Sequence, residues 1–179
     1  EKRTDELIEE YRRLLTRKPK DAGAHLGLAK ALADSGKLDA AVSEFKKASS
    51  LNANDPEPHR QLGTLYVKQK DFGAAAREYT RALNINPSSV PDLVALGFCY
   101  VRNDEYMQAE AALVTALALQ QLTQPQTSTT SPDRLNIMRS LANLLLKEGR
   151  YADAATQFQS ICASDQGTSK ADAPSPTLL

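Results

Sequence analysis

The chain has 179 residues, and its 22 basic and 22 acidic side chains cancel to a formal net charge of zero. This length is enough for one domain or two small ones with a hydrophobic core, and the sequence has no apolar run long enough to span a membrane. The composition excludes collagen-like and disulfide-scaffold proteins, and the balanced charge gives no general attraction to nucleic acid or to anionic membranes.

Apolar residues recur at a helical spacing of three or four along most of the chain, and strand-like alternation is absent from the sequence. In the first helix, Leu7, Ile8, Tyr11 and Leu14 should pack on the following segment and leave some apolar surface bare. We expect helices over residues 4–18, 22–35, 39–52, 56–69, 73–86, 90–103, 107–121, 132–148 and 152–163.

The helix boundaries are indicated by residues that suit the two ends of a helix. Candidate N-caps have side-chain oxygens that can accept the unpaired N–H groups of a first turn. These residues are Asp21, Asp55, Ser89 and Ser131. Gly36 and Gly149 can end helices in the left-handed conformation, and Pro19 and Pro87 prevent two helices from continuing. The sequence therefore predicts short helices joined by tight turns.

The helices form pairs that repeat with a period of 34 residues. Position 8 of the repeat is small in all four copies: Ala29, Gly63, Gly97 and Ala142. Position 20 is always alanine: Ala41, Ala75, Ala109 and Ala154. Position 24 is large: Phe45, Tyr79, Leu113 and Phe158. The small residues would let two helices approach closely, and the large residue would fill the space beside them.

The repeat divides the chain into seven segments. Four copies of the repeat span residues 22–55, 56–89, 90–123 and 135–168, and we call them repeats 1 to 4. Residues 1–21 read as the second helix of a truncated N-terminal repeat, residues 124–134 as an insertion rich in Ser, Thr, Pro and Gln, and residues 169–179 as a disordered tail.

The period and the pattern of small and large residues resemble the tetratricopeptide repeat (TPR) family. The family's closing proline, at position 32, occurs here only as Pro87 among the four whole repeats. The resemblance implies an all-α fold, a right-handed α-solenoid of stacked helix-turn-helix repeats. Each repeat in such an array buries its apolar face against its neighbours. It also implies a role in protein–protein interaction.

The insertion between repeats 3 and 4 is poor in apolar residues and rich in turn formers, which predicts a mobile surface loop. One interpretation is a contact loop or a phosphorylation site at Ser131-Pro132. The other is a tolerated surface insertion in which Ser131 only caps the next helix. We favour the second, because lengthening a loop adds little closure entropy.

The sequence shows no signature of an enzyme, a metal site or a cofactor site. His25 and His59 both occupy position 4 of their repeats and fit packing better than zinc binding, which needs three or four protein ligands. Cys99 and Cys162 fall at helix-packing positions and read as small buried hydrophobes. Because two cysteines cannot form a disulfide framework, we expect a reducing compartment, the cytoplasm.

The first helices of the repeats carry the candidate binding surface. In TPR arrays these helices line the concave face, and the resemblance assigns positions 2, 5, 6, 9, 12 and 13 to that face. Basic residues outnumber acidic ones at these positions, and the stretch around Val94 is apolar. The candidate peptide-binding residues are Lys30, Arg60, Thr64, Lys68, Val94, Phe98, Arg102, Arg139, Asn143 and Lys147. We expect this groove to bind a protein or peptide that presents acidic groups and an apolar anchor, because arginine binds carboxylates in bidentate fashion.

The basic residues also have structural interpretations. Three of them lie at position 13, near the end of the first helix, where a cation complements the helix dipole: Lys68, Arg102 and Lys147. Arg60 and Arg139 lie at position 5 and gain nothing from that dipole, so they indicate either a ligand or a local salt bridge such as Arg60 with Glu57. Exposed salt bridges of that kind are worth only about 0–1 kcal/mol, so reversing the charge of Arg60 or Arg139 should barely change folding.

The sequence thus predicts a non-enzymatic interaction scaffold. Two alternatives stay open, an accessory substrate-recruiting region of a larger enzyme and a structural array that self-associates end to end. The carboxylate clamp of heat-shock co-chaperones is not reproduced, because the positions concerned in repeats 1 to 3 are Leu26, Lys30, Gln61, Pro91 and Ala95.

Overall fold

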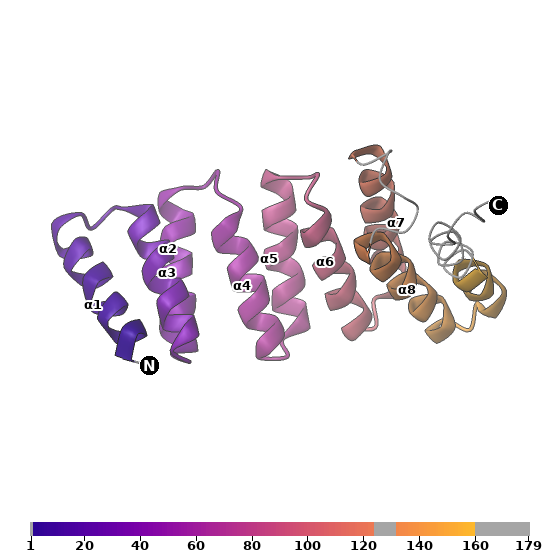
Figure 1. Ribbon diagram of the computed structural model, residues 1–179, viewed down its shortest axis with the longest axis horizontal. Helices are drawn as coiled ribbons and strands as arrows, with labels where there is room; N and C mark the ends of the chain where they lie inside the picture. The colour runs from indigo at the N-terminus through magenta and orange to yellow at the C-terminus, as the bar shows by residue number, and fades with distance from the viewer. Residues whose placement is uncertain (1, 124–131, 160–179) are drawn as a thin grey trace, which may run out of the picture. The chain divides into compact units, whose positions relative to one another are not determined.

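The computed structural model describes residues 2–123 and 132–159, and every regular element in these ranges is an α-helix (Figure 1). The helices are α1 (Lys2–Arg17), α2 (Ala22–Asp34), α3 (Leu38–Leu51), α4 (Glu57–Lys68), α5 (Phe72–Ile85), α6 (Val90–Arg102), α7 (Tyr106–Thr123) and α8 (Pro132–Lys147). A further helical stretch covers residues 151–159. Within the described residues these bounds confirm the predicted helices, and the small differences at their ends are ordinary. Residues 132–134 of the predicted insertion form the start of α8. The rest of the insertion with Ser131, the predicted end of the last helix, the tail and Cys162 lie outside the described residues.

The chain divides into two compact units, Glu1–Asp92 and Leu93–Leu179, and the division falls inside α6. In the N-terminal unit the helices α1 to α5 stand side by side, each packed against the next along the chain (Figure 1). In the C-terminal unit α7 packs against α8. Helix pairs stacked in chain order give the all-α solenoid type of fold that the repeat pattern predicted.

Aspartates cap several helices in the N-terminal unit. Asp21 accepts the backbone N–H of Ala24 at 2.9 Å, which confirms it as the cap of α2. Asp55 accepts a backbone N–H from the first turn of α4 at 2.9 Å. Asp71 caps α5 in the same way as Asp21, although it was not among the predicted caps. These bonds satisfy N–H groups that have no partner within the helix.

The turn inside each repeat places one residue in the left-handed conformation. Gly36 and Gly149 have φ angles of 77° and 73°, as the sequence predicted. The equivalent positions of repeats 2 and 3 hold Lys70 and Asp104, with φ angles of 63° and 60°. Residues with a Cβ atom pay about 1–2 kcal/mol for this conformation. The turn geometry in repeats 2 and 3 is therefore set by the packing of the helices on either side, against the intrinsic backbone preference of Lys70 and Asp104.

Small and large residues pack together between the two helices of a repeat. A Cβ atom added to Gly63 would lie 2.9 Å from the ring of Tyr79, and one added to Gly97 would lie 2.9 Å from Cγ of Leu113. Phe45 and Tyr79 are both buried. The predicted roles of positions 8 and 24 are therefore confirmed in repeats 2 and 3, whereas Phe158 at position 24 of repeat 4 is only partly buried.

The first helix covers the start of repeat 1. Ile8 is buried, and the ring of Tyr11 lies so close to Gly27 that a Cβ atom there would meet it at 2.3 Å. Leu7 and Leu14, which flank Tyr11 at helical spacing, remain exposed. This confirms that α1 packs on the next segment while leaving apolar surface bare.

Both histidines join the two helices of their own repeat. Nδ1 of His25 lies 2.6 Å from the Glu44 carboxylate, and Nδ1 of His59 lies 2.8 Å from the Glu78 carboxylate. The histidines therefore pack between helices, as expected, with acidic partners that the sequence analysis did not foresee. Cys99 is also buried, as predicted, and burial raises the pKa of its thiol to about 11.

Within residues 2–123 and 132–159, no group of three or more His, Cys, Asp or Glu side chains is arranged to hold a metal ion. No helix in those ranges has both the length and the apolar character needed to cross a membrane.

Candidate binding face of the first helices

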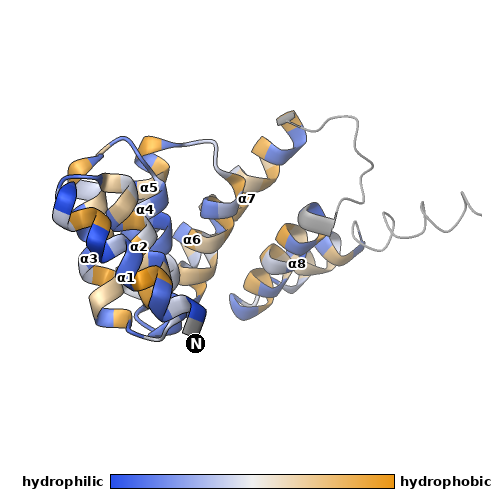
Figure 2. Ribbon diagram, turned by 60° about the vertical axis from the view of Figure 1, so that its left-hand side comes forward, coloured by the Kyte–Doolittle hydropathy of each residue, from blue (hydrophilic) through white to orange (hydrophobic). Residues whose placement is uncertain are grey.

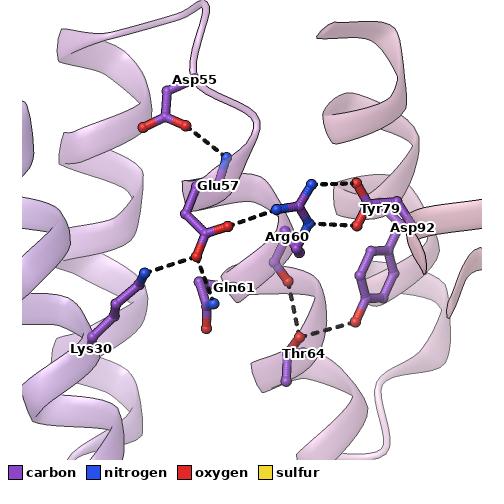
Figure 3. A network of polar contacts seen from close by, with 8 residues as sticks. All are labelled: Lys30, Asp55, Glu57, Arg60, Gln61, Thr64, Tyr79 and Asp92. Atoms are coloured by element: carbon purple, nitrogen blue, oxygen red, sulfur yellow. Dashed lines mark hydrogen bonds and ion pairs between the residues drawn. The ribbon is translucent and has the colours of Figure 1, made fainter. Parts of the chain in front are cut away.

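The ten candidate residues lie on α2, α4, α6 and α8, and none of them is buried. The opposite sides of these helices carry core residues such as Leu28, Leu62 and Leu141. In the N-terminal unit the structure brings Lys30, Arg60 and their acidic neighbours into one network (Figure 3). The candidates on α6 and α8 belong to the C-terminal unit.

Arg60 is held by a bidentate ion pair with Asp92. Nε donates to Oδ1 at 2.6 Å and Nη2 donates to Oδ2 at 2.8 Å, which links α4 to the first turn of α6. The Asp92 side chain is only 1% exposed. A carboxylate taken out of water in this way needs a charged partner. The same bond raises the pKa of the Arg60 guanidinium, which stays fully charged.

Glu57 connects this ion pair to the preceding repeat. Its Oε1 accepts hydrogen bonds from Lys30 Nζ at 2.8 Å and from Gln61 Nε2 at 2.9 Å, and its Oε2 accepts one from Arg60 Nη1 at 2.8 Å (Figure 3). Partial burial pushes the pKa of Glu57 upward, but the bonds from Lys30 and Gln61 and the charge of Arg60 outweigh it. The pKa is therefore held below its usual value.

Thr64 uses its hydroxyl group inside the protein. Its Oγ1 donates to the backbone carbonyl of Arg60 at 3.1 Å and lies 3.1 Å from Oη of Tyr79 (Figure 3). Tyr79 is the buried position-24 residue of repeat 2. Thr64 therefore ties the candidate face to the core of its repeat.

The local salt bridge considered for Arg60 is present, and the sequence analysis missed its stronger partner. Asp92 lies 32 residues from Arg60 and in the next repeat, so no local pattern pointed to it. The available signal was an acidic residue at position 3, where the other repeats have Ala24, Pro58 and Ile137. The buried pair also overturns the expectation that reversing the charge of Arg60 would barely affect folding.

In the C-terminal unit the candidate residues include an aromatic ring on α6 and a row of polar side chains on α8. Phe98 is 49% exposed on α6, and Val94 is half-buried one turn before it. On α8, Arg139, Asn143 and Lys147 follow one another at intervals of four residues, and all three are exposed. No described residue forms an ion pair with Arg139 or Lys147. These two cations therefore remain accessible to a ligand from solvent.

Three family models match most of the chain. One described as TPR repeat matches residues 29–70, and two described as tetratricopeptide repeat match residues 61–89 and 99–169. The chain belongs to the tetratricopeptide repeat family. No curated protein matches this TPR sequence significantly.

Several solved structures resemble the chain in fold. One MamA structure has a TM-score of 0.80 at 20% identity and covers 96% of this chain and 88% of its own. MamA from Desulfovibrio magneticus RS-1 has a TM-score of 0.75 at 17% identity, with coverages of 92% and 86%. YrrB, described as a TPR protein with an unusual peptide-binding site, has a TM-score of 0.70 at 19% identity, with coverages of 89% and 77%. At these identities the likeness concerns the fold alone.

Proposed function

We propose that this TPR chain is a non-enzymatic scaffold that binds a partner polypeptide carrying acidic groups on the exposed face of its first helices. The observation that carries the proposal is the row of Arg139, Asn143 and Lys147 on α8, which is exposed and has no described acidic partner. An uncovered row of this kind can exchange water for the carboxylates of a ligand. The TPR fold, shared with a protein described as peptide-binding, supports the same assignment.

The N-terminal unit contributes less to acid recognition. Lys30 and Arg60 are already paired with Glu57 and Asp92, so an acidic ligand would have to compete with carboxylates inside the protein. This exchange would add little to the free energy of binding, because one ion pair breaks when the other forms. Lys68, in the last turn of α4, is the candidate cation of this unit that is exposed and forms no ion pair with a described residue. Selectivity for acidic partners therefore rests mainly on the two exposed cations of α8.

Each part of the C-terminal face has a chemical role in this proposal. Arg139 and Lys147 attract the acidic groups of the ligand, and the Asn143 amide can both donate to and accept from a peptide backbone. Phe98 supplies an apolar surface for a hydrophobic side chain of the ligand. Because the cations are exposed, binding weakens as salt rises, with a screening length of about 8 Å at physiological ionic strength.

The test is a binding measurement with labelled peptides of matched length that are acidic, neutral or basic and share one aromatic anchor. We expect the acidic set to bind most tightly. Replacing both Arg139 and Lys147 by Glu should lower the affinity for acidic peptides at least about tenfold, which corresponds to about 1.4 kcal/mol of binding free energy. Phe98→Ala should lower the affinity for the acidic and the neutral peptides alike.

The matched control is Lys46→Glu, which reverses an exposed charge on α3, the second helix of repeat 1. It should leave peptide affinity unchanged, and circular dichroism should show native helix content for every variant. Equal affinity of the double reversal and the unaltered chain for acidic peptides would overturn the proposed face.

The cellular setting that fits this proposal is a reducing compartment such as the cytoplasm. Cys99 is buried as a free thiol between helices, and the sequence holds one other cysteine. Such a chain has no disulfide framework that an oxidising compartment would help to form.

A further inference from the structure

The outer face of α7 carries a continuous row of exposed apolar residues. This α7 stripe consists of Met107, Ala111, Val114, Ala118 and Leu122, all exposed. Met107, Val114 and Leu122 are 72%, 47% and 77% exposed. Intervals of four, three, four and four residues place the five side chains on one side of a helix. Hydrophobic residues recur along the whole length of α7 (Figure 2).

The second helices of the preceding repeats differ at these positions. The equivalents of the first four stripe residues in repeat 1 are Asp39, Ser43, Lys46 and Ser50, and those in repeat 2 are Gly73, Arg77, Thr80 and Asn84. Helix α7 is also longer, with 18 residues against 14 in α3 and in α5, and its additional turn carries Leu122. A second helix of this fold therefore does not need an apolar outer face, and the stripe is particular to repeat 3.

The stripe is also free of charge. Glu110 is the one formally charged residue in α7, and it is paired with Arg150 at 2.7 Å. One quarter of the whole chain is charged, so an uncharged exposed helix face stands out against the rest. Apolar surfaces of this kind mark protein interaction sites.

We infer that the α7 stripe binds the same stripe of a second copy of this chain in an antiparallel pair. The order of side chains is large, small, medium, small, large, and it reads the same in both directions around Val114. A two-fold axis beside Val114 would put Met107 against the partner's Leu122 and Ala111 against the partner's Ala118. This reciprocity is what a two-fold interface requires.

The small residues and the absence of charge favour this occupant. Ala111 and Ala118 let two helix backbones approach closely on either side of the central valine. With no net charge on the chain and no charge in the stripe, two copies meet without repulsion. The proposed peptide site lies on α6 and α8, so pairing through α7 uses different residues and does not depend on that proposal.

The size of the stripe sets the strength of the pair. It spans sixteen residues, from Met107 to Leu122, which cover about 22 Å of helix. Stable dimers bring about 20–30 residues from each partner into contact, and the stripe offers five. We therefore expect a weak, concentration-dependent dimer with a dissociation constant between roughly 10 µM and 1 mM.

Sedimentation equilibrium of the 179-residue chain over that range tests the inference. The average mass should rise from the 19.5 kDa of one chain towards twice that value. Val114→Lys and Val114→Glu should each keep the mass at one chain, because a charge beside the axis faces the same charge on the second copy. An equal mixture of the two variants should regain the dimer, because opposite charges then meet.

The matched controls are Thr80→Lys and Thr80→Glu, which place the same charges at the equivalent exposed position of α5. These variants should dimerise like the unaltered chain. A further variant, Met107→Gln with Leu122→Gln, changes only highly exposed side chains and should also weaken the dimer. If circular dichroism shows that either Val114 variant has lost helix content, this double variant still tests whether the stripe forms the dimer.

Three results would overturn the inference. The first is a mass of one chain at all concentrations, and the second is a dimer that the stripe variants leave unchanged. The third is a mixture of the two Val114 variants that stays monomeric, which would exclude the antiparallel pairing. A chain ending at residue 159 that associates more strongly than the full chain would show that residues 160–179 occupy the stripe, and would overturn it as well.

Discussion

At the scale of single residues, the ion pair between Arg60 and Asp92 should have a large effect on stability. The carboxylate is almost fully buried, and the guanidinium holds both of its oxygens. Removing one partner of such a pair leaves an unpaired charge in the interior, whereas replacing both partners by apolar residues leaves no buried charge at all.

We expect Arg60→Ala to lower the free energy of unfolding by about 3–5 kcal/mol. The double change of Arg60→Met with Asp92→Leu should cost less than Arg60→Ala alone. As a control, Lys37→Ala breaks an exposed ion pair with Asp5 and should cost about 0–1 kcal/mol. Urea unfolding of the four proteins measures these values, and equal losses for Arg60→Ala and Lys37→Ala would contradict the prediction.

At the scale of an element, the tight turns store strain in two repeats and avoid it in the other two. Lys70 and Asp104 adopt the left-handed conformation that Gly36 and Gly149 adopt freely. The strain costs about 1–2 kcal/mol, and part of it is offset because a lysine or an aspartate loses less backbone entropy on folding than glycine does.

Lys70→Gly should therefore raise the free energy of unfolding by roughly 0.5–1 kcal/mol. The reverse change, Gly36→Lys, should lower it by a similar amount, because it introduces the same strain into repeat 1. No atom lies within 4 Å of a Cβ atom added at Gly36, so this variant tests backbone conformation and not crowding. Thermal unfolding of both variants measures the effect, and a loss of stability in Lys70→Gly would show the turn to be unstrained.

Elements that follow a local period could be predicted from the sequence. The helices, the glycine turns and the pairing of Gly63 with Tyr79 all depend on residues close together in the chain or at fixed places in the repeat. The candidate face was predicted only as a set of positions. Its ion pairs join residues about 30 positions apart in different repeats, and a repeat pattern does not encode which individual side chains will meet.

The α7 stripe was missed for a related reason. An apolar helix face predicts burial when it is read from the sequence alone, and residues such as Met107 and Leu122 offered no sign that they would be exposed. Only comparison with the polar outer faces of α3 and α5, once their exposure is known, distinguishes this face from core.

For the molecule as a whole, acid sensitivity should concentrate in the N-terminal unit. Glu44 and Glu57 both lie there, and the pKa of each is lowered in the folded state because bonds to cationic partners outweigh burial. A carboxylate with a lowered pKa contributes its full stability above its unfolded value and loses that contribution as pH falls through the folded value.

Stability should therefore fall as pH drops below about 4.5, the ordinary value for glutamate. A variant carrying Glu44→Gln and Glu57→Gln should be less stable than the unaltered chain at pH 7, and the difference should shrink under acid. Unfolding midpoints measured from about pH 3 to pH 7 check this, with hydrogen exchange locating the change. A stability difference that stays constant across that range would refute it.

The ion pair between Arg60 and Asp92 also bears on how such an array can be rearranged. It joins position 5 of repeat 2 to position 3 of repeat 3. The corresponding pairs at the other junctions are apolar: Leu26 with Pro58, and Val94 with Ile137. Exchanging repeats 2 and 3, or duplicating either of them alone, would set a lone charge against an apolar residue. The repeats share one backbone plan but are not interchangeable modules, because this single pair of charges requires repeat 3 to follow repeat 2.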